Sequence, residues 1–151
     1  ADVGALEVSI AAEAGADIVT VLGAVGDEVI EEAVEKAQEL GVVVQVDMIG
    51  VEDVVKRGLE VAKLGVNIVG LHVGIDVQRR RGITATILTR AISKLRNLGL
   101  LVSVAGGLRP ETIPEVVRSG AHIVVVGGYI TRSKNPRDAV RKCLEALTHT
   151  F

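Results

Sequence analysis

The sequence predicts an α/β fold built on a parallel β-sheet. Five glycines each end a stretch with helical periodicity, and each is followed by a short run rich in β-branched residues: Gly15, Gly41, Gly65, Gly99 and Gly120. Glycine is favoured just past a helix end because it adopts the left-handed backbone needed there. Three junctions are near copies: Gly15-Ala-Asp-Ile-Val, Gly65-Val-Asn-Ile-Val and Gly120-Ala-His-Ile-Val. A repeated helix–glycine–strand unit implies βα crossovers between parallel strands.

Composition supports the same fold class. The 151 residues suit one domain, which we expect to span residues 1–151. The chain is 48% hydrophobic, but its only aromatic residues are Tyr129 and Phe151. The core must therefore be packed from Val, Ile, Leu and Ala, a mixture that parallel sheets favour.

The predicted elements alternate along the chain. Helices are expected over residues 4–14, 27–40, 51–64, 84–98, 110–119 and 136–147, and strands over residues 17–22, 42–47, 67–72, 100–104 and 121–126. Pro110 suits the first position of its helix. Either a doubly wound sheet or part of a (β/α)8 barrel satisfies this order, and the chain is shorter than the roughly 200–250 residues of a complete barrel.

Charge and cysteine content exclude some classes of function. Seventeen basic and 19 acidic residues leave a net charge of −2, which gives no general electrostatic reason to bind nucleic acid or a membrane surface. No apolar run reaches the length of a membrane span. The single cysteine, Cys143, excludes an internal disulfide and is expected to be buried filler. A cytoplasmic protein is expected.

Two polar side chains end neighbouring apolar strands. Asp47 ends the run Val42-Val-Val-Gln-Val-Asp47, and His72 ends the strand that starts at Asn67. Ligands of parallel sheets gather beyond the carboxyl ends of the strands. An acid after so apolar a run is costly unless it is paired, metal-bound or in a wet pocket. We therefore interpret His72 as a general acid/base, with Asp47 beside it, although a helix cap and a structural histidine are the simpler alternatives.

Two glycine pairs predict a phosphate site. Gly106 and Gly107 follow one strand, and Gly127 and Gly128 follow the next. Bare backbone N–H groups near helix starts bind anions, and the last two βα loops of barrels commonly hold a phosphate. The basic segment Arg79–Arg81 lies beyond His72 and is either a lid that attracts an anion or a solvated charge run. No Cys/His metal pattern, Walker loop or nucleophile elbow is present.

Several stretches resemble one enzyme family. They are Ala1-Asp2-Val3-Gly4-Ala5-Leu6-Glu7, Gly15-Ala-Asp-Ile-Val-Thr-Val-Leu-Gly23, Val44-Gln-Val-Asp47-Met-Ile-Gly50, Gly70-Leu-His72-Val-Gly-Ile-Asp76 and Val104-Ala-Gly-Gly-Leu108. The likeness, which runs to about Leu147, is to the 3-hexulose-6-phosphate synthases. These are barrels of the orotidine 5′-monophosphate decarboxylase group, beside the 3-keto-L-gulonate-6-phosphate decarboxylases.

The resemblance implies a Mg2+-dependent aldol reaction in which ribulose 5-phosphate and formaldehyde join through an enediolate. It implies that His72 moves the proton at the carbon that becomes nucleophilic and that Asp47 is the acid at the end of the fifth barrel strand. Asp2 matches the last aspartate of an Asp-x-Lys-x-x-Asp motif. In the family that residue reaches the neighbouring subunit's site, so a homodimer is expected. The four paired glycines match the phosphate loops.

The chain also departs from the family pattern. It begins inside the Asp-x-Lys-x-x-Asp motif, so we expect it to represent a barrel from the third helix to the end, without the first three strands and their Mg2+ ligands. Gly128 stands where some relatives place a phosphate-binding arginine, which leaves backbone groups and Arg132 for that role. The alternatives are the related decarboxylase and an inactive, truncated scaffold that binds phosphate.

Overall fold

The computed structural model describes residues 3–73, 88–148 and 150. Five parallel strands form one sheet in the order β1-β2-β3-β4-β5. The strands are β1 (Ile18–Leu22), β2 (Val43–Asp47), β3 (Ile68–His72), β4 (Leu101–Ala105) and β5 (Ile123–Val125). Spatial order equals chain order, so every crossover advances one strand in the same direction. A doubly wound sheet instead reverses at a switch point, so the sheet is of the barrel type.

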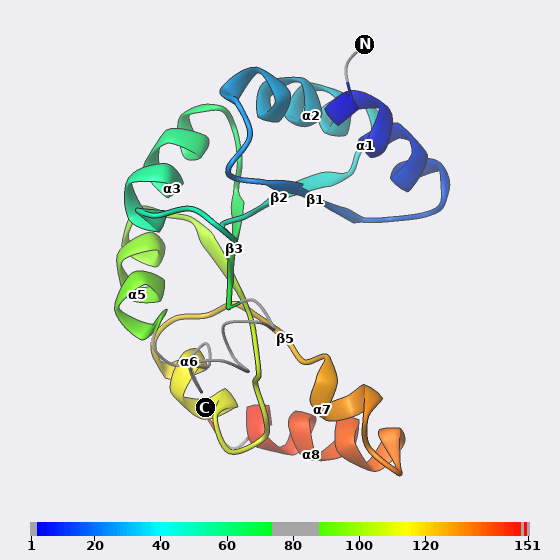
Figure 1. Ribbon diagram of the computed structural model, residues 1–151, viewed down its shortest axis with the longest axis vertical. Helices are drawn as coiled ribbons and strands as arrows, with labels where there is room; N and C mark the ends of the chain where they lie inside the picture. Colours follow the sequence, from blue (N-terminus) through cyan, green and yellow to red (C-terminus); the bar gives the residue numbers. More distant parts are fainter. Residues whose placement is uncertain (1–2, 74–87, 149, 151) are drawn as a thin grey trace.

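Helices line the convex side of the curved sheet, and the opposite face is open (Figure 1). The described helices are α1 (Val3–Glu13), α2 (Asp27–Leu40), α3 (Val54–Lys63), α5 (Thr89–Asn97), α6 (Ile113–Arg118), α7 (Gly128–Thr131) and α8 (Pro136–Thr148). Figure 1 shows α2, α3, α5 and α6 following one another around the outside of the curve. None of the helices within the described ranges is long and apolar enough to cross a bilayer.

Side-chain alternation along the strands divides the sheet into a buried and an open face. Residues that face the helices, such as Val46, Val69 and Val102, are fully buried against the helical core residues Ile30 and Leu95. On the open face, five apolar strand residues are between 41% and 50% exposed: Ile18, Leu22, Val43, Leu101 and Val125. The main hydrophobic core therefore lies on the helix side, although Ile68 on the open face is also buried.

The glycine junctions have the backbone that the sequence predicts. All five have positive φ, from 71° at Gly41 to 109° at Gly120. At Gly41 the left-handed residue is the C-cap of α2, and its N–H bonds to carbonyls of the last turn. The prediction that these glycines end helices before strands is confirmed.

Two predicted helix starts are wrong. The helix expected from residue 51 begins at Val54, because the Asp53 carboxylate caps it by accepting hydrogen bonds from the N–H groups of Val55 and Lys56. The helix expected from Pro110 begins at Ile113, with Pro114 in its first turn. Pro110 instead lies in a turn closed by Thr112, whose hydroxyl accepts from the Arg109 N–H and donates to the Arg109 carbonyl. The short α7 was not predicted.

Candidate functional site

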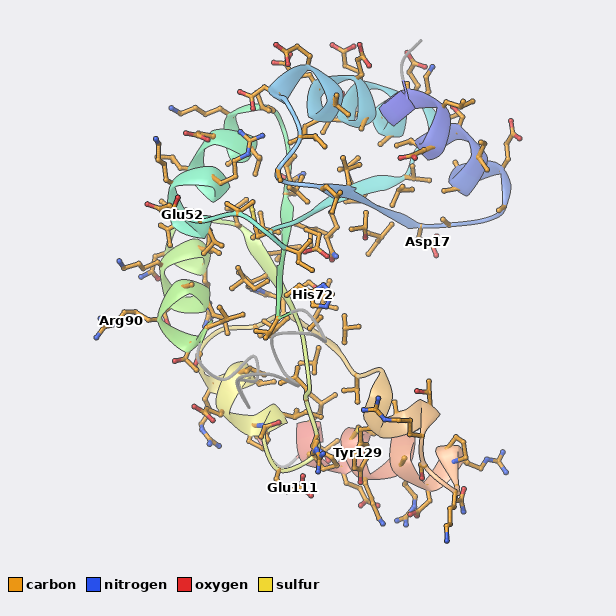
Figure 2. The ribbon with its side chains drawn as sticks, in the orientation of Figure 1. Asp17, Glu52, His72, Arg90, Glu111 and Tyr129 are labelled. Carbon is orange, nitrogen blue, oxygen red and sulfur yellow. The ribbon has the colours of Figure 1, made fainter. Side chains whose placement is uncertain are left out.

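Asp47 and His72 meet at the carboxyl end of the sheet. They are the last residues of the neighbouring strands β2 and β3, and His72 Nδ1 lies 3.2 Å from Asp47 Oδ2. Figure 2 shows His72 projecting toward the open side of the sheet, away from α3 and α5. The His72 side chain is 32% exposed and that of Asp47 is 19% exposed. The structure thus brings together the two residues that strand ends alone had predicted.

Backbone contacts fix the position of Asp47. Its Oδ1 accepts a hydrogen bond from the Ile49 N–H at 2.8 Å, and its carbonyl accepts one from the Gly23 N–H at 2.7 Å. The next residue along, Met48, donates its N–H to the Gly70 carbonyl at 2.8 Å. Asp47 does not cap α3, since Asp53 has that role. Its carboxylate is therefore held at the strand end, facing His72.

This geometry suits proton transfer by the histidine. When the imidazole is neutral, Nδ1–H donates to the Asp47 carboxylate, and the lone pair is then on Nε2. A carboxylate that fixes the tautomer in this way leaves Nε2 free to take a proton from a substrate, and it stabilises the imidazolium that results. The pair can act as a general acid/base.

The first glycine turn lies directly beside this pair. Gly106 has a φ of 120° and Gly107 a φ of 69°, which L side chains rarely adopt. A Cβ on Gly106 would lie 2.8 Å from the carbonyl oxygen of Val73, the residue after His72. The Val73 N–H in turn donates to the Ala105 carbonyl at 3.2 Å. The turn after β4 therefore packs closely on the chain that leaves the histidine.

The second glycine turn is open and basic. Gly127 is the N-cap of α7, and a Cβ built there would have no atom within 4 Å. At Gly128 the guanidinium of Arg132 fills the place of a side chain, with Cζ 2.7 Å from the ideal Cβ position. The two turns follow β4 and β5, whose last residues Ala105 and Val125 are paired. Both glycine pairs thus lie at the carboxyl end of the sheet, as His72 does.

The remaining predicted residues are either buried away from the candidate site or outside the described ranges. Asp2 and the basic segment Arg79–Arg81 are outside the residues that the structure describes. Cys143 is buried, and burial, together with the charge of Glu111, raises the pKa of its thiol. This agrees with its expected role as filler.

The described residues do not form a Mg2+ site. Within these ranges no group of three or more His, Cys, Asp or Glu side chains converges. Asp47 contributes one carboxylate, and its two oxygens already contact the Ile49 N–H and His72. Since Mg2+ prefers octahedral oxygen coordination, this single carboxylate is a poor fit for the ion.

Arg57, which holds the loop after β1, was not predicted from the sequence. From the first turn of α3 its guanidinium donates to the carbonyls of Gly23 at 2.8 Å and Val25 at 3.0 Å, in the loop after β1. It also pairs with Asp27 at 2.6 Å and Glu60 at 3.2 Å. Burial alone lowers the pKa of Arg57, but these two carboxylates together raise it. No sequence pattern marks the contacts with the loop, because the loop residues lie 30 or more positions away.

The singly wound sheet, with its polar pair and glycine turns at the strand ends, defines the chain as a parallel βα protein of the barrel class. Comparison with known proteins then places it more closely. Residues 1–143 match the Orotidine 5'-phosphate decarboxylase / HUMPS family, and the chain belongs to that family.

Several curated relatives are named 3-hexulose-6-phosphate synthase. The chain is 42% identical to 3-hexulose-6-phosphate synthase of Mycobacterium gastri over 146 residues, which are 97% of this chain and 69% of the relative. A crystal structure of a 3-hexulose-6-phosphate synthase superposes with a TM-score of 0.90 at 42% identity, over 96% of this chain and 69% of the other. A crystal structure of a ligand complex of KGPDC from Streptococcus mutans has a TM-score of 0.91 at 21% identity, covering 100% of this chain and 70% of that one. That last likeness concerns the fold alone.

Proposed function

We propose that the chain is the greater part of a 3-hexulose-6-phosphate synthase, an aldolase that condenses formaldehyde with ribulose 5-phosphate. The observation that carries this proposal is the Asp47–His72 pair, held at 3.2 Å on adjacent strand ends in a chain that is 42% identical to a synthase of that name. The decarboxylases of the same fold are supported less well, because their likeness at 21% identity is one of fold.

In the proposed reaction His72 Nε2 removes a proton from C1 of ribulose 5-phosphate, beside the C2 carbonyl. The electron pair left on C1, delocalised as an enediolate, attacks the carbon of formaldehyde and forms the new C–C bond. The resulting alkoxide takes up a proton and the His72 imidazolium gives one up, which restores the neutral histidine and leaves an arabino-hexulose 6-phosphate. Asp47 keeps the Nδ1–H of His72 in place and stabilises the imidazolium formed in the first step. Mg2+ is proposed by resemblance, with ligands outside the described residues.

The substrate phosphate is assigned to Gly106, Gly107, Gly127 and Gly128. Support comes from their positions directly after the adjacent strands β4 and β5, at the same carboxyl end of the sheet as His72. Arg132 adds a positive charge over Gly128, where a side chain would otherwise stand. Backbone N–H groups together with a guanidinium suit a phosphate dianion.

The five strands are proposed to belong to a (β/α)8 barrel whose other three strands lie outside this chain. The curved sheet exposes apolar side chains on its inner face, such as Leu22, Val43 and Val125. β1 and β5 are its edge strands. Additional strands between those edges would bury this face and pair both edges, which otherwise invite aggregation.

A homodimer and a cytoplasmic location complete the proposal. Asp2 is assigned by resemblance to the active site of the partner subunit. Support for a subunit contact comes from α1, the helix that follows Asp2, because Leu6 and Ile10 on successive turns are 61% and 59% exposed.

The proposal is tested by incubating the chain with ribulose 5-phosphate, formaldehyde and Mg2+ and measuring formaldehyde consumption. The assay is repeated with the segment of the Mycobacterium gastri synthase that this chain lacks, supplied as a separate polypeptide. Turnover in either arm, lost in His72→Ala, supports the synthase. If neither arm consumes formaldehyde, the synthase proposal fails. Decarboxylation of 3-keto-L-gulonate 6-phosphate would then favour the decarboxylase, and phosphate binding without turnover would favour the inactive scaffold.

A further inference from the structure

Gln45 lies on the open face of the sheet, next to the Asp47–His72 pair. It stands two residues before Asp47 on β2, so both side chains are on the same face. On β3, Gly70 stands two residues before His72 and pairs with Asp47. A Cβ at Gly70 would lie 3.1 Å from Gln45 Nε2 and 3.4 Å from its Cδ. The amide of Gln45 therefore occupies the room left by the missing side chain of Gly70, at the base of the candidate site.

Most of the hydrogen-bonding capacity of this amide is unused. Its one partner among the described residues is Thr20, with Gln45 Nε2 3.4 Å from Thr20 Oγ1, which is long for such a bond. A glutamine amide offers two donors and two acceptor positions. The side chain is only partly buried, so its free positions face the open side of the sheet, where the proposed substrate binds.

The neighbouring strand continues this polar floor. Ser103 on β4 pairs with Gly70, and it is the one buried polar residue among those that the structure describes, at 2% exposure. Interior positions of a βα barrel are normally filled by bulky branched side chains. Here Gln45 and Gly70 take their place beside Asp47, and Ser103 does so one strand further along, which favours a polar ligand over simple packing.

We propose that Gln45 is a substrate-binding residue whose amide bonds an oxygen of the ketose chain next to the reacting carbon. This inference rests on the proposed function and adds a specificity residue to it. A neutral amide suits a polyol because it can donate to a carbonyl oxygen and accept from a hydroxyl at once. The alternative role is to fill the space over Gly70, which requires volume but no hydrogen bond.

The test separates hydrogen bonding from volume. Gln45→Met keeps the length and bulk of the side chain but removes the amide. The dissociation constants of ribulose 5-phosphate and of inorganic phosphate are measured by calorimetry on the same full chain, together with the melting temperature. We expect Gln45→Met to weaken ribulose 5-phosphate binding about 5- to 100-fold, as expected for one partner left unpaired. Phosphate binding and the melting temperature should stay at wild-type values.

Gly70→Ala provides a second variant. Its Cβ would displace the amide, so it should weaken ribulose 5-phosphate binding in the wild-type background and change it little further in Gln45→Ala. Wild-type affinity for ribulose 5-phosphate in Gln45→Met overturns the assignment, and so does an equal loss for both ligands. A wild-type chain that binds phosphate but not ribulose 5-phosphate, even with the missing segment of the Mycobacterium gastri synthase supplied, overturns the proposed function itself, and the role of Gln45 with it.

Discussion

His72 Nδ1 and Asp47 Oδ2 are 3.2 Å apart across two neighbouring parallel strands. The other oxygen of the same carboxylate accepts from the Ile49 N–H at 2.8 Å. One carboxylate oxygen of Asp47 is thus held by a backbone N–H two residues further along the chain, and the other faces the imidazole. This arrangement explains why an acid is needed at the end of so apolar a strand: each carboxylate oxygen has a separate donor.

Asp47→Asn should disable the site while leaving the fold intact. An amide has only one oxygen, so it can accept from Ile49 or from His72 but not from both. If its NH2 group faces the histidine, Nδ1 must become the acceptor, and the proton moves to Nε2, the atom proposed as the base. We expect kcat for formaldehyde consumption to fall about 10²- to 10⁴-fold. The 15N shifts of His72 should report the change of tautomer.

Asp53→Asn is the matched control for this change. Asp53 caps α3 with one carboxylate oxygen, which accepts from both Val55 and Lys56, and asparagine is an equally good N-cap. Its kcat should stay within about twofold of the wild-type value. An Asp47→Asn protein with wild-type kcat would show that the carboxylate does not assist His72.

A side chain at Gly106 should destabilise the fold more than a side chain at Gly127. Gly106→Ala requires an L residue at a φ of 120° and places a Cβ 2.8 Å from the Val73 carbonyl oxygen, a backbone atom that cannot turn aside. We expect a loss of about 1–3 kcal/mol in the free energy of unfolding, measured by urea denaturation. Gly127→Ala meets no atom within 4 Å, and its loss should stay under about 1 kcal/mol. Equal losses at both positions would contradict this view of the two turns.

The parts of the fold set by local chemistry were predictable from the sequence. All five junction glycines have the expected positive φ, and the strand ends at Asp47 and His72 were found because they are polar residues after apolar runs. Helix starts were less predictable, because several residues compete to cap. Asp53 caps α3, which therefore begins at Val54 rather than at residue 51. Thr112 closes a turn around Pro110, so α6 begins at Ile113.

Long-range polar contacts were beyond sequence reasoning. Nothing in the periodicity indicates that Arg57 bonds loop carbonyls 32 and 34 residues earlier, or that Gln45 lies over Gly70. Both contacts depend on which strands pair and in what register. The repeated βα unit predicts parallel strands, but it does not predict their register. The choice between a doubly wound sheet and a barrel needed the observed strand order for the same reason.

Burial of Cys143 should make stability depend on alkaline pH. Burial raises the pKa of this thiol above its ordinary value of 9.0. Above about pH 9 the unfolded chain therefore loses the thiol proton while the folded chain still keeps it. The unfolded state is then favoured, so the stabilisation is complete below the unfolded pKa and is lost as pH rises through the folded pKa. Between about pH 8 and 10.5 the free energy of unfolding should fall more steeply for wild type than for Cys143→Ala. Parallel curves would contradict the prediction.

Arg57→Ala should destabilise the loop that follows β1. Its guanidinium is the described donor to the Gly23 and Val25 carbonyls, and its side chain is only 15% exposed. Removing it leaves two partly buried carbonyls and the Asp27 and Glu60 carboxylates without this partner, so we expect a loss of about 1–3 kcal/mol in urea denaturation. Arg57→Lys keeps the charge but cannot reach both carbonyls, and it should recover only part of the loss.

The control for Arg57 is Arg141, which also contacts two acids, Asp138 and Glu145, but from an exposed position on α8. Its side chain is 62% exposed, so solvent screens both ion pairs, and Arg141→Ala should leave the urea denaturation midpoint close to that of wild type.

Because the Gly23 N–H donates to the Asp47 carbonyl, the loop that Arg57 holds also abuts the candidate site. Arg57→Ala should therefore lower kcat as well as stability, and Arg141→Ala neither. Equal effects of the two substitutions would show that the loop contacts of Arg57 have no special role.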